Sequence, residues 1–105
     1  MAVKDVTQAT FAQEVLQSEQ PVMVDFWATW CAPCRMLGPV VDQVADELAS
    51  SLKVCKVNID EEMELAREYN VMSIPCIVIF KGGKEVNRSV GVVPKQKLIS
   101  LVEGL

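Results

Sequence analysis

A predicted strand and the start of a predicted helix meet in the segment Pro21-Val-Met-Val-Asp-Phe-Trp-Ala-Thr-Trp-Cys-Ala-Pro-Cys34. Its first eight residues are apolar at nearly every position, which is typical of a strand covered on both faces, as in a parallel sheet. Pro33 suits the first turn of a helix, because the N–H that proline lacks would have no partner there. We therefore expect Cys31 and Cys34 to lie where a central strand passes into a helix.

Strand and helix patterns alternate through the rest of the chain. Besides the strand over residues 21–28, strands are predicted over residues 3–6, 52–59, 76–80 and 85–90. Helices are predicted to follow Thr7, to cover residues 33–51, to run from a cap at Asp60 to a stop at Asn70, and to cover residues 94–104. Gly82 and Gly83 predict a hairpin between the last two strands. This order predicts an α/β fold with a mixed sheet and helices on both faces.

Composition restricts the possible functions. The 105 residues, half of them hydrophobic, are expected to form one domain over residues 1–105 that needs no disulfide or metal for its stability. Ten basic against fourteen acidic residues give a net charge of −4, and the basic residues are scattered, so nucleic acid is not an expected partner. The chain has no His, which excludes imidazole bases and His-based metal sites. Any catalysis must use Cys, Asp, Glu, Lys or Tyr.

The first eleven residues lack the charged region, apolar stretch and cleavage site of a signal peptide. No apolar run approaches the ~20 residues that a membrane span needs. We therefore expect a cytoplasmic protein with no membrane contact. In a reducing compartment, four cysteines are more often reactive, metal-binding or core residues than a disulfide framework.

The two cysteines of the CxxC pair have different predicted environments. Cys31 would occupy the cap of the helix, where free N–H groups and the helix dipole favour a thiolate by ~0.3–2 kcal/mol. Cys34 lies three residues further on, and side chains at this spacing are neighbours at ~5–6 Å, which overlaps the Cα separation of disulfides. Such a short loop contributes little stability, so the pattern favours a reversible redox pair over a structural disulfide.

The segment Phe26-Trp-Ala-Thr-Trp-Cys-Ala-Pro-Cys34 resembles the active-site segment of the thioredoxin family. The other segments that match the family in order and spacing are Asp25, Pro39, Val57-Asn-Ile-Asp60, Ser73-Ile-Pro75, Phe80-Lys-Gly-Gly83 and Gly91. The resemblance covers essentially the whole chain. It implies a thioredoxin fold, with a central five-stranded mixed sheet flanked by four helices, and activity as a protein disulfide reductase. One departure is Ala32, where the family usually has Gly, and this affects the expected reduction potential.

Asp25 is the only charged residue between Pro21 and Arg35, within an apolar strand. Burial would raise the pKa of its carboxyl toward neutrality, which suits a general base that deprotonates Cys34. The alternative is a carboxyl hydrogen-bonded for structure alone. The resemblance assigns the base role to this position, and it matches Lys56 to the lysine that neighbours the aspartate. Taken alone, Lys56 would be a solvated lysine, or one whose aliphatic stem is buried while its ammonium group reaches water.

The resemblance also implies a substrate surface around the CxxC pair. It implies a cis Ile74–Pro75 peptide bond in a loop against the two cysteines, with Ile74 offering backbone hydrogen bonds to an extended substrate. The residues expected to form an apolar rim around this loop are Trp30, Pro33, Gly91 and Val92. The implied partners are proteins that contain disulfides and, as electron donor, an NADPH-dependent flavin thioredoxin reductase.

Cys55 and Cys76 leave further interpretations open. Cys55 is predicted to be a small buried hydrophobe, whereas Cys76, where the family commonly has Thr, is either a core residue or a second redox group. A zinc site built from all four cysteines, a noncatalytic binding module, and a thiol oxidase or isomerase are the alternatives to a reductase. The chain has no Gly-rich nucleotide loop, so no cofactor is expected, and a monomer is the default.

Overall fold

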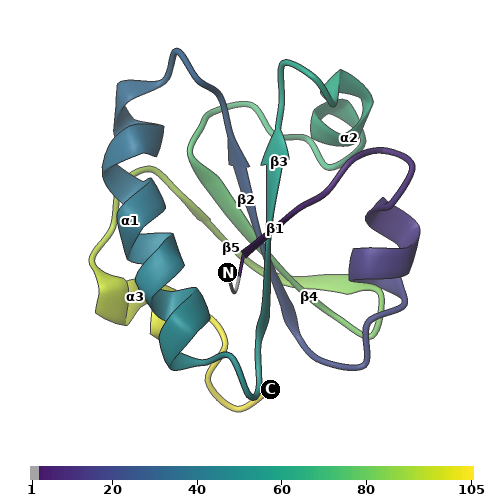
Figure 1. Cartoon of the computed structure of the whole chain (residues 1–105), viewed down its shortest axis with the longest axis vertical. Helices are drawn as coiled ribbons and strands as arrows, with labels where there is room; N and C mark the ends of the chain where they lie inside the picture. Colours follow the sequence, from purple (N-terminus) through teal and green to yellow (C-terminus); the bar gives the residue numbers. More distant parts are fainter. Residues whose placement is uncertain (1–2) are drawn as a thin grey trace.

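A single five-stranded sheet organises the computed structural model, which describes residues 3–105 (Figure 1). The strands are β1 (Val3–Asp5), β2 (Val22–Trp27), β3 (Lys53–Asn58), β4 (Cys76–Lys81) and β5 (Lys84–Val90). Their order is β1-β3-β2-β4-β5, with β1, β3 and β2 parallel and with β4 antiparallel to both β2 and β5. The predicted mixed sheet of the thioredoxin fold is therefore confirmed.

Helical segments cover both faces of the sheet. They are η1 (Ala12–Leu16), which is a π-helical turn, and the α-helices α1 (Ala32–Glu47), α2 (Met63–Glu68) and α3 (Lys95–Ser100). The helices α1 and α3 lie on one face, and η1 and α2 lie on the other (Figure 1). Among residues 3–105, none of these helices is long and apolar enough to cross a membrane.

Two apolar cores result from the alternation of side chains along the strands. On β2, Met23 points into the core beneath α1 and α3, while Val24 and Phe26 point into the core beneath η1 and α2. Cys55 of β3 and Cys76 of β4 are fully buried in this second core. The buried charge Asp25 has the same parity as Met23, so its side chain lies on the α1 face.

The helix ends differ from the predicted ones. The helix α1 continues through Pro39 and ends at Glu47, four residues before the predicted Ser51, because Leu48 adopts a non-helical φ of −110°. No side chain caps η1 or α2, so the caps predicted at Thr7 and Asp60 are wrong. Two turn predictions are confirmed, since Asn70 follows α2 with a φ of 55° and Gly82 and Gly83 form the hairpin with φ of 60° and 81°.

Candidate active site

Cys31 is the N-cap of α1, as its sequence position predicts. Its φ and ψ are −94° and 106°, and its Sγ accepts a hydrogen bond of 3.2 Å from the Cys34 N–H. The Cys31 N–H itself donates to the Ala28 carbonyl at 3.2 Å, which fixes the turn between β2 and α1. A sulfur in this position receives both an N–H group and the positive end of the helix dipole, and both favour a thiolate.

Cys31 and Cys34 form a disulfide, with a Cα separation of 5.3 Å. Both residues are about 95% buried, at 4% and 5% exposure, and they pack against Ala28 with Trp27, Ile59 and Ile74 nearby. Between them Ala32 and Pro33 are exposed at the first turn of α1. The pair is thus oxidised and almost fully buried.

A loop from the other side of the sheet lies against the disulfide. The Ile74–Pro75 peptide bond is cis, as the family resemblance implies, and the Ile74 carbonyl oxygen lies 3.9 Å from Cys31 Sγ. The Gly91 N–H donates to the Pro75 carbonyl at 2.8 Å, so the segment after β5 is joined to this loop. Val92 follows and is half exposed. The structure therefore brings Ile74 to the disulfide and joins Gly91 to the adjacent Pro75, while Val92 is placed only as the residue that follows Gly91.

Trp30 directly precedes Cys31 in the chain. Its ring is 65% exposed, and its Nε1 donates a 2.8 Å hydrogen bond to Asp60 Oδ2. The Asp60 N–H in turn donates to Asn58 Oδ1 at 2.9 Å. Asp60 thus orients Trp30 instead of capping α2. The sequence offered one signal for this role, an exposed indole N–H that needs an acceptor, but not the residue that meets it.

Asp25 lines the same pocket as Cys34 and is 2% exposed. Burial raises the pKa of its carboxyl from 3.8 to about 6, while the charge of Lys56 opposes the rise and that of Asp42 adds to it. Within residues 3–105, Asp25 Oδ1 has no hydrogen-bond partner. A pocket of about 150 Å³ connects Asp25 with Cys34, and the other residues lining it are Trp27, Arg35, Gly38 and Lys56.

Lys56 is the parallel-strand neighbour of Asp25, through the β2–β3 register. Its Nζ forms an ion pair with Asp42 Oδ1 at 3.2 Å, and its side chain is only 19% exposed. Lys56 is therefore not a freely solvated lysine. The sequence did not single out Asp42 or Gly38, because both belong to a helical pattern whose other members face water or the core.

Cys55 and Cys76 lie apart from the disulfide, in the core beneath η1 and α2. Burial raises the pKa of the Cys55 thiol to about 11, and it also raises that of the Cys76 thiol. Over residues 3–105, no three His, Cys, Asp or Glu side chains are grouped so as to hold a metal ion. The structure does not bring the four cysteines together, so the zinc site considered from the sequence has no geometric support.

The comparisons with known proteins agree with this arrangement. The thioredoxin family profile matches residues 2–104. The chain is 52% identical to thioredoxin of Pyropia yezoensis over 100 residues, which cover 95% of this chain and 94% of that protein. It is 52% identical to thioredoxin 1 of Nostoc sp. over 102 residues, which cover 97% of this chain and 95% of that protein. It is also 49% identical to chloroplastic thioredoxin M-type of Chlamydomonas reinhardtii over 98 residues, which cover 93% of this chain and 70% of that protein. The chain therefore belongs to the thioredoxin family and is a protein disulfide reductase, which acts by thiol–disulfide exchange.

Proposed function

We propose that Cys31 attacks the target disulfide and that Cys34 resolves the complex. The Cys31 thiolate attacks one target sulfur, the target S–S bond breaks, and the second target sulfur leaves as a thiolate that takes up a proton. The Cys34 thiolate then attacks Cys31 Sγ, which releases the second target thiol and leaves the Cys31–Cys34 disulfide. The N-cap position of Cys31, with its 3.2 Å hydrogen bond from the Cys34 N–H, carries this assignment.

Asp25 acts as the base that takes the proton of Cys34 before the second step. Its burial and its pKa of about 6 support this role, because a carboxyl with such a pKa is a stronger base than an exposed one and is still mainly ionised at pH 7. The pocket of about 150 Å³ between Asp25 and Cys34 is large enough for water to carry the proton. Lys56 borders the same pocket and tunes the charge of Asp25.

Extended segments of target proteins bind across the loop of Ile74 and Pro75. The Ile74 backbone pairs with the target backbone, and the half-exposed apolar groups around the disulfide contact target side chains. The rim that we assign consists of Trp30, Pro33, Gly91 and Val92. The proximity of Ile74 O to Cys31 Sγ, at 3.9 Å, supports this surface, because a target disulfide must reach the same sulfur.

A charge placed on this rim tests the docking surface. We expect Val92→Asp to raise KM for a protein disulfide by about 5- to 20-fold, because the carboxylate must be desolvated on docking. The rate with a small aromatic disulfide should stay unchanged. The matched control is Val86→Asp on β5, since Val86 and Val92 are 48% and 47% exposed. Equal KM values for Val92→Asp and Val86→Asp would place the docking surface elsewhere.

Disulfide-containing proteins are the substrates of this chain, and we propose an NADPH-dependent flavin thioredoxin reductase as its electron donor. The chain itself uses no cofactor, and we infer that it acts as a monomer formed by a single domain over residues 1–105. Both cores pack against the same sheet, which supports a single domain. Sedimentation equilibrium tests the monomer.

We also propose a reducing compartment, the cytoplasm, because Cys55 and Cys76 remain free thiols. Fractionation of the source cells tests this location.

The redox equilibrium of the Cys31–Cys34 pair decides between a reductase and an oxidase or isomerase. We expect a reversible two-electron couple well below the glutathione poise, measured by alkylation of thiols in graded dithiothreitol and glutathione buffers followed by intact mass. Ala32→Gly is the matched variant, and only a minor change is expected because Ala32 is exposed at the first turn of α1. A couple near the strongly oxidising end would instead indicate an oxidase or isomerase.

A further inference from the structure

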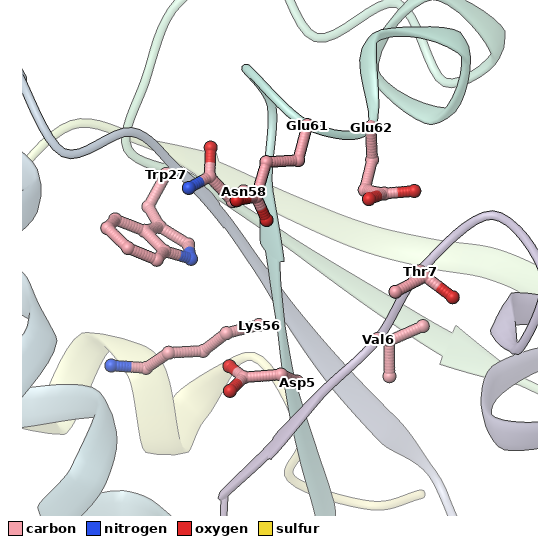
Figure 2. Close-up of a pocket in the computed structure, with 8 residues that line it drawn as sticks. All are labelled: Asp5, Val6, Thr7, Trp27, Lys56, Asn58, Glu61 and Glu62. Carbon is pink, nitrogen blue, oxygen red and sulfur yellow. The ribbon is translucent and has the colours of Figure 1, made fainter.

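Three carboxylates compete for the ammonium group of Lys56. Asp5 on β1 and Asp25 on β2 are the register partners of Lys56 on either side of β3, and Asp42 lies on α1. Within residues 3–105, only Asp42 forms an ion pair with Lys56, at 3.2 Å. Asp5 forms no ion pair with Lys56 among these residues. In Figure 2 the Lys56 side chain extends from β3 toward α1, and the Asp5 carboxylate lies nearer to its aliphatic stem than to its ammonium group.

Gly38 and Asp42 form the seat of this ammonium on α1. They are four residues apart, so they lie one above the other on the same face of the helix. A Cβ built on Gly38 would stand 3.6 Å from Lys56 Nζ, which means that the ammonium rests against bare backbone at this position. Asp42 then supplies the acceptor from one turn further along.

The position of the Lys56 ammonium against Gly38 and Asp42 determines which charged groups lie next to the Asp25 carboxylate. Lys56 stands at the pocket between α1 and the sheet without pairing with Asp25, whose Oδ1 has no partner among residues 3–105. The remaining titratable groups near Asp25 are Cys34 and Arg35, which line the pocket from α1, and Cys76, which acts from β4. A direct Lys56–Asp25 ion pair would give a carboxylate that is stable but too weakly basic to deprotonate Cys34.

We propose that Asp42 is a positioning residue, which holds the Lys56 ammonium against Gly38 of α1 and so prevents a direct ion pair with Asp25. The importance of this device for catalysis rests on the proposed role of Asp25 as the base. The device itself does not, because it concerns only where one ammonium group lies. Both consequences of losing Asp42 have the same sign: a negative charge near Asp25 disappears, and Lys56 becomes free to approach its carboxylate.

The test is the titration of Asp25 in Asp42→Asn. We measure it by carbon-13 NMR of the side-chain carboxyl in the oxidised protein, where Cys31 and Cys34 do not titrate. We expect the pKa of Asp25 to fall by about half a unit or more, the effect of one partly exposed charge at short range. The matched control is Asp46→Asn, which removes an exposed carboxylate one turn further along α1 and should leave this pKa unchanged.

A second variant separates loss of the Asp42 charge from release of Lys56. In a Lys56→Met background, Asp42→Asn should shift the pKa of Asp25 by less than it does in the parent, because no ammonium remains to be released. An equal shift in both backgrounds would overturn the positioning role. An unchanged or raised pKa in Asp42→Asn alone would also overturn it, since Lys56 would then have moved to Asp5 or into water.

The acid limb of target reduction provides the functional readout. If Asp25 is the base, this limb should move to lower pH in Asp42→Asn by the same amount as the carboxyl pKa, and it should not move in Asp46→Asn. A lowered pKa with an unmoved limb would support the positioning role of Asp42 and would contradict the base role of Asp25. The two proposals therefore fail in distinguishable ways.

Discussion

Cys34→Ser is expected to stop turnover while leaving the first chemical step intact. Cys31 keeps its N-cap position, so it still attacks a target disulfide, but no thiol at residue 34 is present to displace it. The mixed disulfide should accumulate to one target per chain, and multiple turnover should fall by at least about 10³-fold. Non-reducing gels and intact mass detect the complex directly.

The control for this result is Cys31→Ser, which should form no covalent complex at all. Comparable turnover in Cys34→Ser and the parent would contradict the assignment of Cys34, and it would direct attention to the free thiols. Cys76 and Cys55 are the thiols that would have to replace Cys34, and their burial in the opposite core makes such a replacement unfavourable. Cysteine-to-serine changes at these two positions would then identify the substitute.

Asp25→Asn is expected to slow the resolving step about 10- to 100-fold at pH 7, toward the lower end of what a general base contributes because solvent bases remain available. The first attack by Cys31 should be much less affected. Stopped-flow tryptophan fluorescence separates the two steps, because Trp27 packs against the disulfide and Trp30 directly precedes Cys31. Equal slowing of both steps would show that Asp25 supports the site without acting as the base for Cys34.

The same variant is expected to be more stable than the parent at neutral pH. The pKa of Asp25 rises on folding from 3.8 to about 6, so the folded chain retains a proton that the unfolded chain has lost between these values. Stability therefore falls as pH rises through this window and stays reduced above pH 6. At ~1.36 kcal/mol per pKa unit, Asp25→Asn should gain up to about 3 kcal/mol at pH 7.

Urea unfolding at pH 4 and at pH 7 measures this effect. The gain should be present at pH 7 and nearly absent at pH 4, where the carboxyl of the folded parent is already neutral. A gain of the same size at both pH values would mean that it comes from packing or hydrogen bonding and not from the buried charge. Asp46→Asn supplies an exposed control on α1, for which no such pH dependence is expected.

The sequence predicted the sheet and the site segment well because both depend on strong local signals. The apolar run before Trp27 requires a strand buried on both faces, and Pro33 with Cys31 marks the start of a helix. The burial of Asp25 followed from its isolation among apolar residues. Gly82 and Gly83 predicted the hairpin because the turn needs two residues with positive φ.

The contacts between distant segments could not be predicted in this way. Asp60 is of a residue type that often caps helices, so the sequence favoured that role. Its hydrogen bond with Trp30 arises only because the loop after β3 packs against the end of β2. The pairing of Asp42 with Lys56 likewise depends on the rotation of α1 over the sheet. The end of α1 was predicted too late because helical propensity alone does not show where the chain turns toward β3.

The location of Cys55 and Cys76 has a consequence for the stoichiometry of electron transfer. Both thiols are buried in the core beneath η1 and α2, in a different cluster from the Cys31–Cys34 disulfide, so we expect neither to exchange with it. Each chain is therefore a shuttle with a capacity of one electron pair. A target with two disulfides must therefore react with two reduced chains in turn. The number of electron pairs available to all targets at any moment equals the number of reduced chains.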